Sequence, residues 1–469
     1  MFKIYNFPKV NFKIMNRKNF LSHIGTTLAA AALTSNLISC ERKQGKKIRG
    51  LKNWAGNYTY QADEVRYPQD IVNLSKLLKS HSKVKALGTQ HCFNEIADTS
   101  GLQLSTKNLK SIIELNEELS YVIVESGIKY GDLGIVLHSN GLALHNLASL
   151  PHISVGGSCA TATHGSGVRN GNLATALKGF ELLTPGGELL WVDQQTNTDL
   201  FHAGGVSMGA LGIMTKVKLA IQPTFEVSQR VYENLSMDAL KNNFDKIMSE
   251  GYSVSFFTHW LDKNINQVWV KSREDELREI PSDFYGATPA TLDLHPIKAN
   301  SPINCTPQMG VPGPWHKRLP HFKMDFTPSN GDELQSEFFV GRENAFEAIM
   351  AIEALHDKIA PLLFISEIRC IAADNFWMST AYQRESVAIH FTWKPDPEGV
   401  IAILSEIQAA LSPFKARPHW GKIFTISGDE LATRYPKFEE FLSFKRELDP
   451  KGVLNNSYLD KALKISNSS

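Results

Sequence analysis

Two stretches of the sequence combine glycine with hydroxyl side chains in a pattern that suits a phosphate-bearing ligand. The longer one spans residues 149–167 and reads Ser-Leu-Pro-His-Ile-Ser-Val-Gly-Gly-Ser-Cys-Ala-Thr-Ala-Thr-His-Gly-Ser-Gly. Its four glycines can take up positive φ and let the backbone approach a bulky ligand closely. Backbone N–H groups beside the serines and threonines can then bond phosphate oxygens. The composition predicts a ligand-lining loop, and the alternative is an ordinary Gly/Ser-rich surface loop.

The shorter stretch spans residues 86–95 and reads Ala-Leu-Gly-Thr-Gln-His-Cys-Phe-Asn-Glu. Residues 83–87 predict a strand, so His91 would lie just after a strand end. Taken alone, a histidine in such a loop is more often a hydrogen-bonding residue than a reactive one. We expect the neighbouring Cys92 to be a buried thiol.

Charged residues alternate along a third candidate segment. Glu367 and Arg369 are two positions apart in an extended run and so face the same side of a strand. Apolar neighbours favour a partly buried pair, which needs a function or partners, over a weak surface ion pair. His390 and Thr392 repeat the same spacing in the next candidate strand. Four polar side chains are thereby predicted to face one site.

These motifs occur together in an order that identifies a family. The chain resembles the alditol oxidases, also called xylitol oxidases, which belong to the vanillyl-alcohol oxidase type (PCMH-type) of FAD-binding oxidoreductases and are related to the aldonolactone oxidases. The resemblance covers about residues 53–459. Besides the two loops it is carried by Asn-Trp-Ala-Gly-Asn at 53–57, Glu-Ile-Arg at 367–369, His-Phe-Thr-Trp at 390–393 and Pro-His-Trp-Gly-Lys at 418–422.

The resemblance implies that FAD lies between the two loops and is bonded covalently to His91. Such a bond tends to make the flavin a stronger electron acceptor. His164 is either a flavin contact or a structural hydrogen-bonding residue. The residues expected to contact FAD are Ala86, Leu87, Gly88, Thr89, Gln90, His91, Cys92, Ser149, Ser154, Gly157, Thr161, Ala162, Thr163, His164, Ile213, His419 and Lys422.

The resemblance also implies a reaction. A terminal hydroxyl of an alditol, such as xylitol or sorbitol, is oxidised to the aldose by hydride transfer to flavin N5, and O2 is reduced to H2O2. His390 or Glu367 would accept the hydroxyl proton, and Lys422 near the flavin ring would stabilise the reduced, negatively charged flavin. The expected catalytic residues are Glu367, Arg369, His390 and Lys422, and the expected substrate-binding residues are Ser149, Glu367, Arg369 and Thr392.

Three other functions stay open at this point. An aldonolactone oxidase of the D-arabinono-1,4-lactone or L-gulono-1,4-lactone type would share the flavin loops. A dehydrogenase would pass the electrons to a quinone or a cytochrome. A non-catalytic, ligand-binding lipoprotein would keep the fold without a flavin. A pocket of many polar groups favours the polyol, because an unmatched buried polar group costs about 1–3 kcal/mol.

Length and composition set the broad class. A chain of 469 residues favours two domains, and 42% apolar with 21% charged residues is typical of a globular protein. The net charge of +1 gives no support to a nucleic-acid partner. The five cysteines have no CxxC spacing, which argues against a metal site or a disulfide framework. We expect a monomer.

The N-terminus reads as an export signal. A basic Arg-Lys-Asn-Phe-Leu run at 17–21 precedes an apolar run at 24–33 and a Leu-Ile-Ser-Cys ending at Cys40. The apolar run is too short to span a membrane. Residues 1–40 are therefore predicted to be a signal peptide with a lipobox, and 41–52 a polar tether. A lipid on Cys40 would hold the protein at a bacterial membrane surface, in the periplasm or on the outer face. The alternative is a leader with a coincidental cysteine, and a twin-arginine route is open.

The elements that must position these residues fall into an α+β pattern with three parts. Residues 53–222 form the predicted FAD-binding domain, with strands at 83–87, 121–124, two within 180–192 and one within 211–221. Its predicted helices are one that opens at Tyr67-Pro68 and has an apolar face over 71–78, and one at 131–139. Residues 223–417 form the predicted cap domain, an antiparallel sheet with helices on one face, with strands at 253–260, 267–271, 334–340, 363–370 and 386–393 and helices at 343–359 and 397–411. Residues 418–465 are expected to return to the FAD-binding domain.

Overall fold

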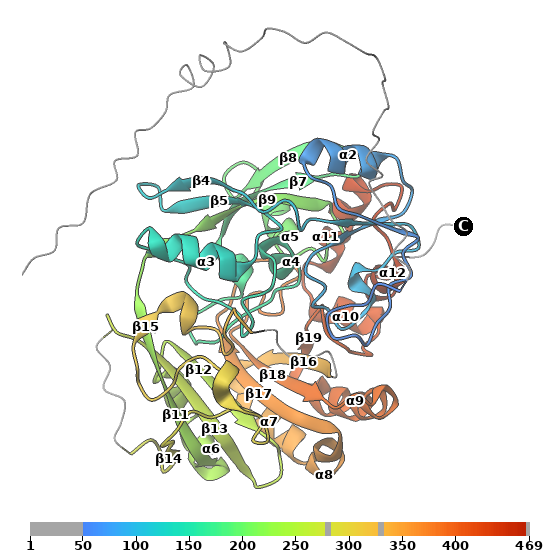
Figure 1. Cartoon of the computed structure of the whole chain (residues 1–469). Helices are drawn as coiled ribbons and strands as arrows, with labels where there is room; N and C mark the ends of the chain where they lie inside the picture. Colours follow the sequence, from blue (N-terminus) through green and yellow to red (C-terminus); the bar gives the residue numbers. More distant parts are fainter. Residues whose placement is uncertain (1–49, 277–282, 327–332, 466–469) are drawn as a thin grey trace, which may run out of the picture. The chain divides into compact units, whose positions relative to one another are not determined.

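The structure is a computed structural model that describes residues 50–276, 283–326 and 333–465 (Figure 1). The predicted signal peptide with Cys40, and most of the predicted tether, lie outside the described residues. Within the described part, no helix is both long and apolar enough to cross a membrane.

A small parallel sheet carries the shorter of the two glycine-containing loops. Helix α2 (Ile71–Lys79) begins where the Asp70 side chain accepts a hydrogen bond from the backbone N–H of Asn73. Its Leu74 and Leu78, one turn apart, are fully buried. The predicted helix and strand are confirmed, and the strand ends directly before Gly88. The sheet has the order β1-β3-β2, with β1 at Glu64–Arg66, β2 at Val84–Leu87 and β3 at Leu102–Ser105.

A five-stranded antiparallel sheet lies in the same half of the molecule (Figure 1). The sequence predicts four of its strands but not β4, a partly exposed strand at the sheet edge. Its order is β4-β5-β9-β7-β8, with β4 at Ile112–Asn116, β5 at Tyr121–Glu125, β7 at Leu177–Leu183, β8 at Leu189–Asp193 and β9 at Ile213–Ala220. Around it lie α3 (Tyr130–Ser139), α4 (Val155–Ala160), α5 (Thr198–Gly204) and the paired short strands β6 (Leu142–Ala143) and β10 (Gln222–Pro223).

The second half is built on a nine-stranded antiparallel sheet (Figure 1). Its path runs β14-β11-β13-β12-β17-β18-β16-β19, and β15 pairs with β11. The strands are β11 (Glu226–Ser236), β12 (Ser253–Thr258), β13 (Asn264–Arg273), β14 (Thr288–Pro289), β15 (Gly313–Pro314), β16 (Leu334–Gly341), β17 (Leu363–Ile371), β18 (Ser386–Trp393) and β19 (Arg417–Pro418).

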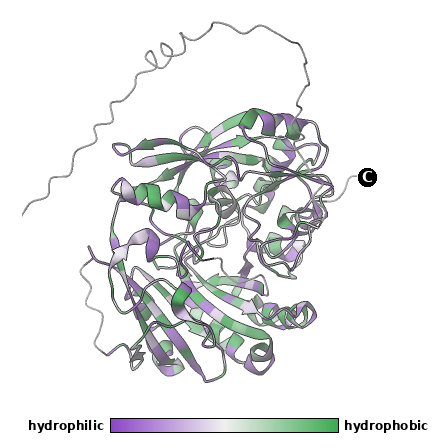
Figure 2. Cartoon of the chain, viewed as in Figure 1, coloured by the Kyte–Doolittle hydropathy of each residue, from purple (hydrophilic) through white to green (hydrophobic). Residues whose placement is uncertain are grey.

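Helices cover one face of this sheet, as the sequence predicts. Helix α6 (Met237–Ser249) contacts β11 and β12, α7 (Ala345–Glu353) contacts β16, and α7 also contacts α6 and α9 (Pro397–Leu411). Figure 2 shows long hydrophobic segments along these strands and helices. Polar side chains of β16, β17 and β18 lie on the opposite face of the sheet and line a cavity.

Three predictions about local structure are wrong. The sequence analysis misses β11, an eleven-residue strand in which charged exposed residues interrupt the buried ones. The predicted helix at 343–359 is two helices, α7 and α8 (His356–Ile359), because Ala354 and Leu355 interrupt it. The predicted loop at 149–167 contains the short helix α4, and only Gly167 of its four glycines has positive φ.

The C-terminal segment packs against the first half of the chain. It contains α10 (Gly428–Arg434), α11 (Phe438–Leu448) and α12 (Ser457–Ala462). The backbone N–H of Val84 donates to Val453 O at 2.8 Å, and the Asn456 side chain donates to three carbonyls between Glu95 and Asp98. The last part of the chain therefore supports the strand that precedes the His91 loop.

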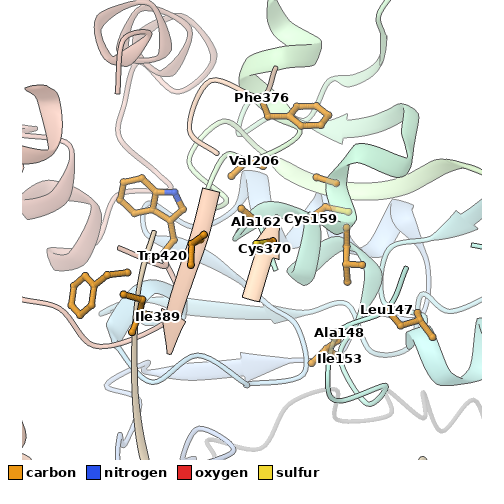
Figure 3. Packing of buried hydrophobic residues seen from close by; sticks show 14 of the residues in the cluster. Leu147, Ala148, Ile153, Cys159, Ala162, Val206, Cys370, Phe376, Ile389 and Trp420 are labelled. Atoms are coloured by element: carbon orange, nitrogen blue, oxygen red, sulfur yellow. The ribbon is translucent and has the colours of Figure 1, made fainter. Parts of the chain in front are cut away.

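One hydrophobic cluster joins the longer glycine-containing stretch to the nine-stranded sheet. Cys159 and Ala162 belong to the same buried cluster as Cys370 of β17, Ile389 of β18 and Trp420 (Figure 3). A backbone hydrogen bond from Gly167 N to Cys370 O, 2.9 Å long, adds a direct link. Burial of this apolar surface fixes the loop against the sheet that faces it.

Candidate active site

A cavity of about 450 Å³ lies where the two glycine-containing stretches meet the polar face of the nine-stranded sheet. Its size is that of a ligand site. Most of the lining comes from five regions: residues 85–93, residues within 148–164, residues within 207–214, residues within 295–326, and the polar face of β16, β17 and β18 with the segment 419–422. Residues more than 300 positions apart thus share one site.

The first end of the cavity, which is formed by the two glycine-containing stretches, is shaped by close backbone packing. A Cβ added at Gly88 would lie 2.8 Å from Ser154 Oγ, and one added at Gly157 would lie 3.0 Å from the same atom. At Gly156 an added Cβ would lie 2.7 Å from Ser126 Cβ. Gly156 and Gly157 have ordinary φ, so the prediction that they adopt positive φ is wrong. All three glycines are needed because a larger side chain would collide with Ser154 or Ser126.

His91 projects into this end with no polar partner. Its ring stacks on Trp54, with ring centroids 5.2 Å apart and an angle of 16° between the planes. Both ring nitrogens are buried and have no hydrogen-bond partner among the described residues. Burial, assisted by the nearby His152, lowers the pKa of His91 to about 4, so the imidazole is neutral at physiological pH. A neutral imidazole with a free nitrogen can act as a nucleophile.

These features fit FAD as the ligand of this end. Gly88, Gly156 and Gly157 line a cradle between the loops, and the hydroxyl groups of Thr89, Ser154, Thr161 and Thr163 line the same region. A histidine with two unpaired nitrogens stands beside the cradle. A buried polar group without a partner is costly, and a ligand atom bonded to one nitrogen would remove part of that cost.

The second end of the cavity carries a row of three side chains across neighbouring strands. His390 of β18 is directly opposite Glu337 of β16 on one side and Glu367 of β17 on the other. All three are at least nine-tenths buried. Because neighbouring strands in a sheet are about 4.8 Å apart, the backbone itself sets the spacing of this row.

Glu337 is the centre of a buried charge cluster. Its carboxylate accepts hydrogen bonds from Lys422 Nζ at 2.6 Å and from an Arg369 guanidinium nitrogen at 3.0 Å, and His164 Nε2 lies 3.2 Å away. Burial alone would raise the pKa of Glu337, but Lys422 and His164 outweigh it, so the pKa lies well below its usual value. Glu337 is thus a permanent carboxylate that holds three side chains of the site in place.

Glu367 is held by a different set of partners. His321 Nε2 lies 2.7 Å from Glu367 Oε1, and Arg369 Nε lies 3.5 Å from the same oxygen. Burial opposes ionisation, but Arg369 and His321 lower the pKa of Glu367 below its usual range. Arg369 also donates to Ser149 Oγ at 3.2 Å, which connects the sheet to the longer glycine-containing stretch.

His390 is a neutral imidazole with one free nitrogen. Its Nε2 lies 3.0 Å from Gln335 Oε1, and Gln335 donates its amide N–H to Glu333 Oε1 at 2.6 Å. The amide of Gln335 therefore presents its oxygen to His390, so Nε2 carries the proton and Nδ1 has a free lone pair. Burial, helped by Lys422, lowers the pKa of His390 to about 3. His390 Nδ1 is buried and has no hydrogen-bond partner among the described residues.

The structure brings nearly all the predicted site residues to this cavity. Ala162 is the exception: it is fully buried in the hydrophobic cluster and does not line the cavity, because its backbone turns there with a φ of 55°. Cys92 is half-buried in the wall, and the other described cysteines, at 159, 305 and 370, are buried free thiols. His164 lines the cavity and contacts Glu337, so it is both a lining residue and a hydrogen-bonding one.

Sequence reasoning misses four residues of the site. Gln335 and Glu337 have the same two-residue spacing as Glu367 and Arg369. Glu337 directly precedes the apolar run Phe-Phe-Val, and this position indicates a buried charge. His321 and Lys271, described below, gave no comparable signal. His321 lies in a segment without periodicity, and a single lysine in β13 reads as an exposed residue.

Comparisons with known proteins agree with this geometry. The FAD binding domain family model matches residues 63–193, and the D-arabinono-1,4-lactone oxidase family model matches residues 330–462. An alditol oxidase from Streptomyces sp. (strain IKD472 / FERM P-14339) is 43% identical over 412 residues, which cover 87% of this chain and 98% of that protein. An L-gulono-1,4-lactone dehydrogenase from Mycobacterium tuberculosis is 26% identical over 437 residues, covering 88% and 98% of the two chains.

The fold is also found among solved structures. Cholesterol oxidase from B. sterolicum superposes with a TM-score of 0.69 at 16% identity, covering 92% of this chain and 100% of the other. This likeness concerns the fold alone. The extended match to the Streptomyces protein, with the FAD-binding domain and the cavity that both predicted loops line, identifies the family. The chain belongs to the alditol oxidase family of FAD-binding oxidoreductases.

Proposed function

We propose that the protein oxidises a terminal hydroxyl of an alditol, such as xylitol or sorbitol, to the aldose, with FAD as cofactor and O2 as the electron acceptor. The observation that carries the proposal is the polar row at the second end of the cavity, opposite the cradle beside His91. A polyol presents many hydroxyl groups and no charge, so it needs fixed donors and acceptors on the protein.

The side chains of the polar row and its neighbours provide both hydrogen-bond donors and acceptors for the substrate hydroxyls. Ionised Glu367 accepts a hydrogen bond from one hydroxyl, and Arg369, already oriented by Glu337, donates to another. Ser149 and Thr392 supply hydroxyl groups that can donate or accept. Glu367, Arg369 and Ser149 are each held by a protein neighbour, which favours binding of the substrate in one orientation.

His390 is the better candidate for the group that accepts the hydroxyl proton. The hydrogen bond to Gln335 leaves Nδ1 free, whereas Glu367 is tied to Arg369 and His321 and is a weak base. When bound, FAD supplies the two-electron oxidation and the reaction with O2 that gives H2O2. Lys422 Nζ, fixed by Glu337, provides positive charge in the cavity wall.

We further propose that FAD is bonded covalently to His91. The support is the neutral imidazole whose two nitrogens have no partner, held flat against Trp54. Acid precipitation of the purified protein should give a yellow pellet. The His91→Ala variant should release its flavin into the supernatant, and a yellow pellet from that variant would place the attachment elsewhere.

Substrate assays test the activity itself. H2O2 should form with xylitol or sorbitol and not with L-gulono-1,4-lactone or D-arabinono-1,4-lactone. The match of residues 330–462 to the lactone oxidase family model makes lactone oxidation the second candidate, and the opposite result would favour it. Reduction of an added dye without consumption of O2 would instead favour a dehydrogenase.

We also propose that the protein is exported and lipid-anchored at Cys40, and that it acts as a monomer. The support is the basic, apolar and Leu-Ile-Ser-Cys pattern of residues 17–40. Cys40→Ser should move the protein from the detergent phase to the aqueous phase in Triton X-114 partitioning. Unchanged partitioning would contradict the anchor, and light scattering would test the oligomeric state.

A further inference from the structure

Lys271 is a buried lysine that has no carboxylate partner within hydrogen-bond distance in the part of the chain that the structure describes. It lies in β13, with 1% of its side chain surface exposed. Its Nζ lies 2.5 Å from Leu319 O, 2.9 Å from Pro320 O and 3.2 Å from His321 Nδ1. An ammonium group has three hydrogens to donate and no lone pair. Three acceptors therefore use all its hydrogens, and one of the three is the ring of His321.

The His321 ring has a fixed orientation. It is packed edge-on against Phe257 and Trp269, with ring centroids 5.5 Å and 5.1 Å away. Its backbone N–H donates to Ser149 O at 3.1 Å, so the residue is tied to the substrate end of the cavity at both the main chain and the side chain. The ring cannot turn over without losing both ring-nitrogen contacts.

The two contacts of the ring determine its protonation. Because Lys271 donates to Nδ1, that nitrogen must carry a lone pair, so the proton of neutral His321 resides on Nε2. Nε2 then donates to Glu367 Oε1 at 2.7 Å. Burial lowers the pKa of Lys271 to about 7, and Glu367 opposes this shift. In its charged form Lys271 also opposes a second proton on the ring. Glu367 thus receives a hydrogen bond from a neutral donor and retains its own negative charge.

We propose that Lys271 is a positioning residue for substrate binding, which acts by keeping His321 neutral and in its Nε2–H form. The proposal rests on the proposed function, because its consequence is that Glu367 stays available as a charged acceptor for a polyol hydroxyl. Burial is the largest cause that lowers the pKa of His321 to about 4, and Lys271 is the second. Without Lys271, Nδ1 loses its donor and the ring loses the charge that opposes a second proton, which favours an imidazolium beside Glu367. That cation neutralises the carboxylate and competes with the substrate for it.

The kinetic test is the Lys271→Met variant, which keeps the unbranched apolar stem of the side chain and removes the terminal donor. We expect the KM for xylitol to rise about tenfold, the scale of one hydrogen bond to a charged group, while kcat changes less than threefold. An unchanged KM would overturn the proposal. If this variant does not fold, the pair His321→Gln and His321→Leu replaces it: only the leucine variant should raise KM, and equal effects would overturn the proposal.

A double variant separates the protonation effect from lost packing. A glutamine at position 321 can donate to Glu367 and accept from Lys271 whatever the charge nearby. Lys271→Met should therefore raise KM much less in the His321→Gln background than in the wild type. Equal effects in the two backgrounds would overturn the proposal.

A spectroscopic test needs no substrate. With ¹⁵N-labelled histidine, and His321→Gln to assign the signal, the wild-type ring should show one protonated nitrogen, Nε2, and one bare nitrogen. Lys271→Met should raise the pKa of the ring, so that the signal of a ring with two protonated nitrogens appears at a higher pH than in the wild type, and an unchanged pH dependence of the signal would overturn the proposal. Lys85→Met is a matched control: Lys85 is equally buried and donates to three carbonyls but to no histidine. It should leave the His321 signal unchanged.

The proposed function and the role of Lys271 can be refuted separately. If the wild-type protein forms no H2O2 from any alditol, the proposed function falls, and the signal of His321 still decides whether Lys271 sets the protonation of the ring. If the wild-type protein oxidises xylitol and the KM of Lys271→Met is unchanged, the function stands and the role of Lys271 is refuted.

Discussion

The two ends of the cavity differ in the kind of side chain that lines them. The end beside His91 consists of glycines, hydroxyl groups and one neutral imidazole, with its shape set by loops packed at close range. The end formed by the nine-stranded sheet consists of buried acids and bases that hold one another in place. The dinucleotide proposed for the first end brings its own charged phosphates, whereas a polyol is neutral. The charged side chains therefore lie at the end proposed for the neutral polyol.

The largest effect should come from removing Glu337, on which the charged end depends. Glu337→Leu would leave Lys422, Arg369 and His164 without their common acceptor, and breaking a buried ion pair costs about 3–5 kcal/mol. We expect a strongly lowered melting temperature and no detectable oxidation of xylitol. Glu337→Gln, which keeps the shape and one acceptor oxygen, should be milder. A Glu337→Leu protein that melts like the wild type would contradict the central role of this carboxylate.

Arg369 tests whether the charged end recognises substrate by geometry or by charge alone. Arg369→Lys keeps the charge but cannot reach Glu337 and Ser149 together as the guanidinium does. We expect KM for xylitol to rise roughly 10–100-fold, equivalent to about 1.5–3 kcal/mol. Steady-state kinetics with a neutral dye or O2 as acceptor would measure it. A KM within threefold of the wild type would mean that charge alone is sufficient.

Gly156 and Gly157 test close packing at the other end. An added methyl at Gly156 meets the Cβ and backbone oxygen of Ser126, whereas at Gly157 it meets only the movable Ser154 hydroxyl. Gly156→Ala should therefore lower the free energy of unfolding by about 1 kcal/mol, the cost of overpacking less the gain in helix propensity. Gly157→Ala should cost less or nothing, as measured by urea unfolding. The reverse order would show that the loops are more pliable than their contacts indicate.

The smallest effect concerns pH. Because burial and Lys422 lower the pKa of His390 to about 3, its imidazole stays neutral and able to accept a proton at every pH above about 4. As pH falls from 7 to 5, kcat/KM for xylitol should thus change less than threefold. A loss of activity with an apparent pKa near 6.5, the value of an ordinary histidine, would show that His390 is more exposed to water in the working enzyme.

The sequence predicts these two ends unequally. Alternation places Glu367, Arg369, His390 and Thr392 on one face, because the period of a strand is independent of what surrounds it. The two loops are predicted from composition and from the family resemblance together. Local signals cannot show that α4 forms, since its small residues are helical only when they pack against Ser126 and the sheet. Likewise His321 reaches Glu367 across 46 positions, a pairing that only tertiary structure creates.

The row formed by Glu337, His390 and Glu367 has a consequence for how the family can diversify. Hydrogen bonds between the backbones of β16, β18 and β17 hold the three positions in register, whatever side chains they bear. Exchanging His390, which does not hold other charged side chains in place as Glu337 does, alters the chemical character of a subsite while the strand register is kept. Substrate preference can then change by single substitutions while the backbone of the sheet stays the same.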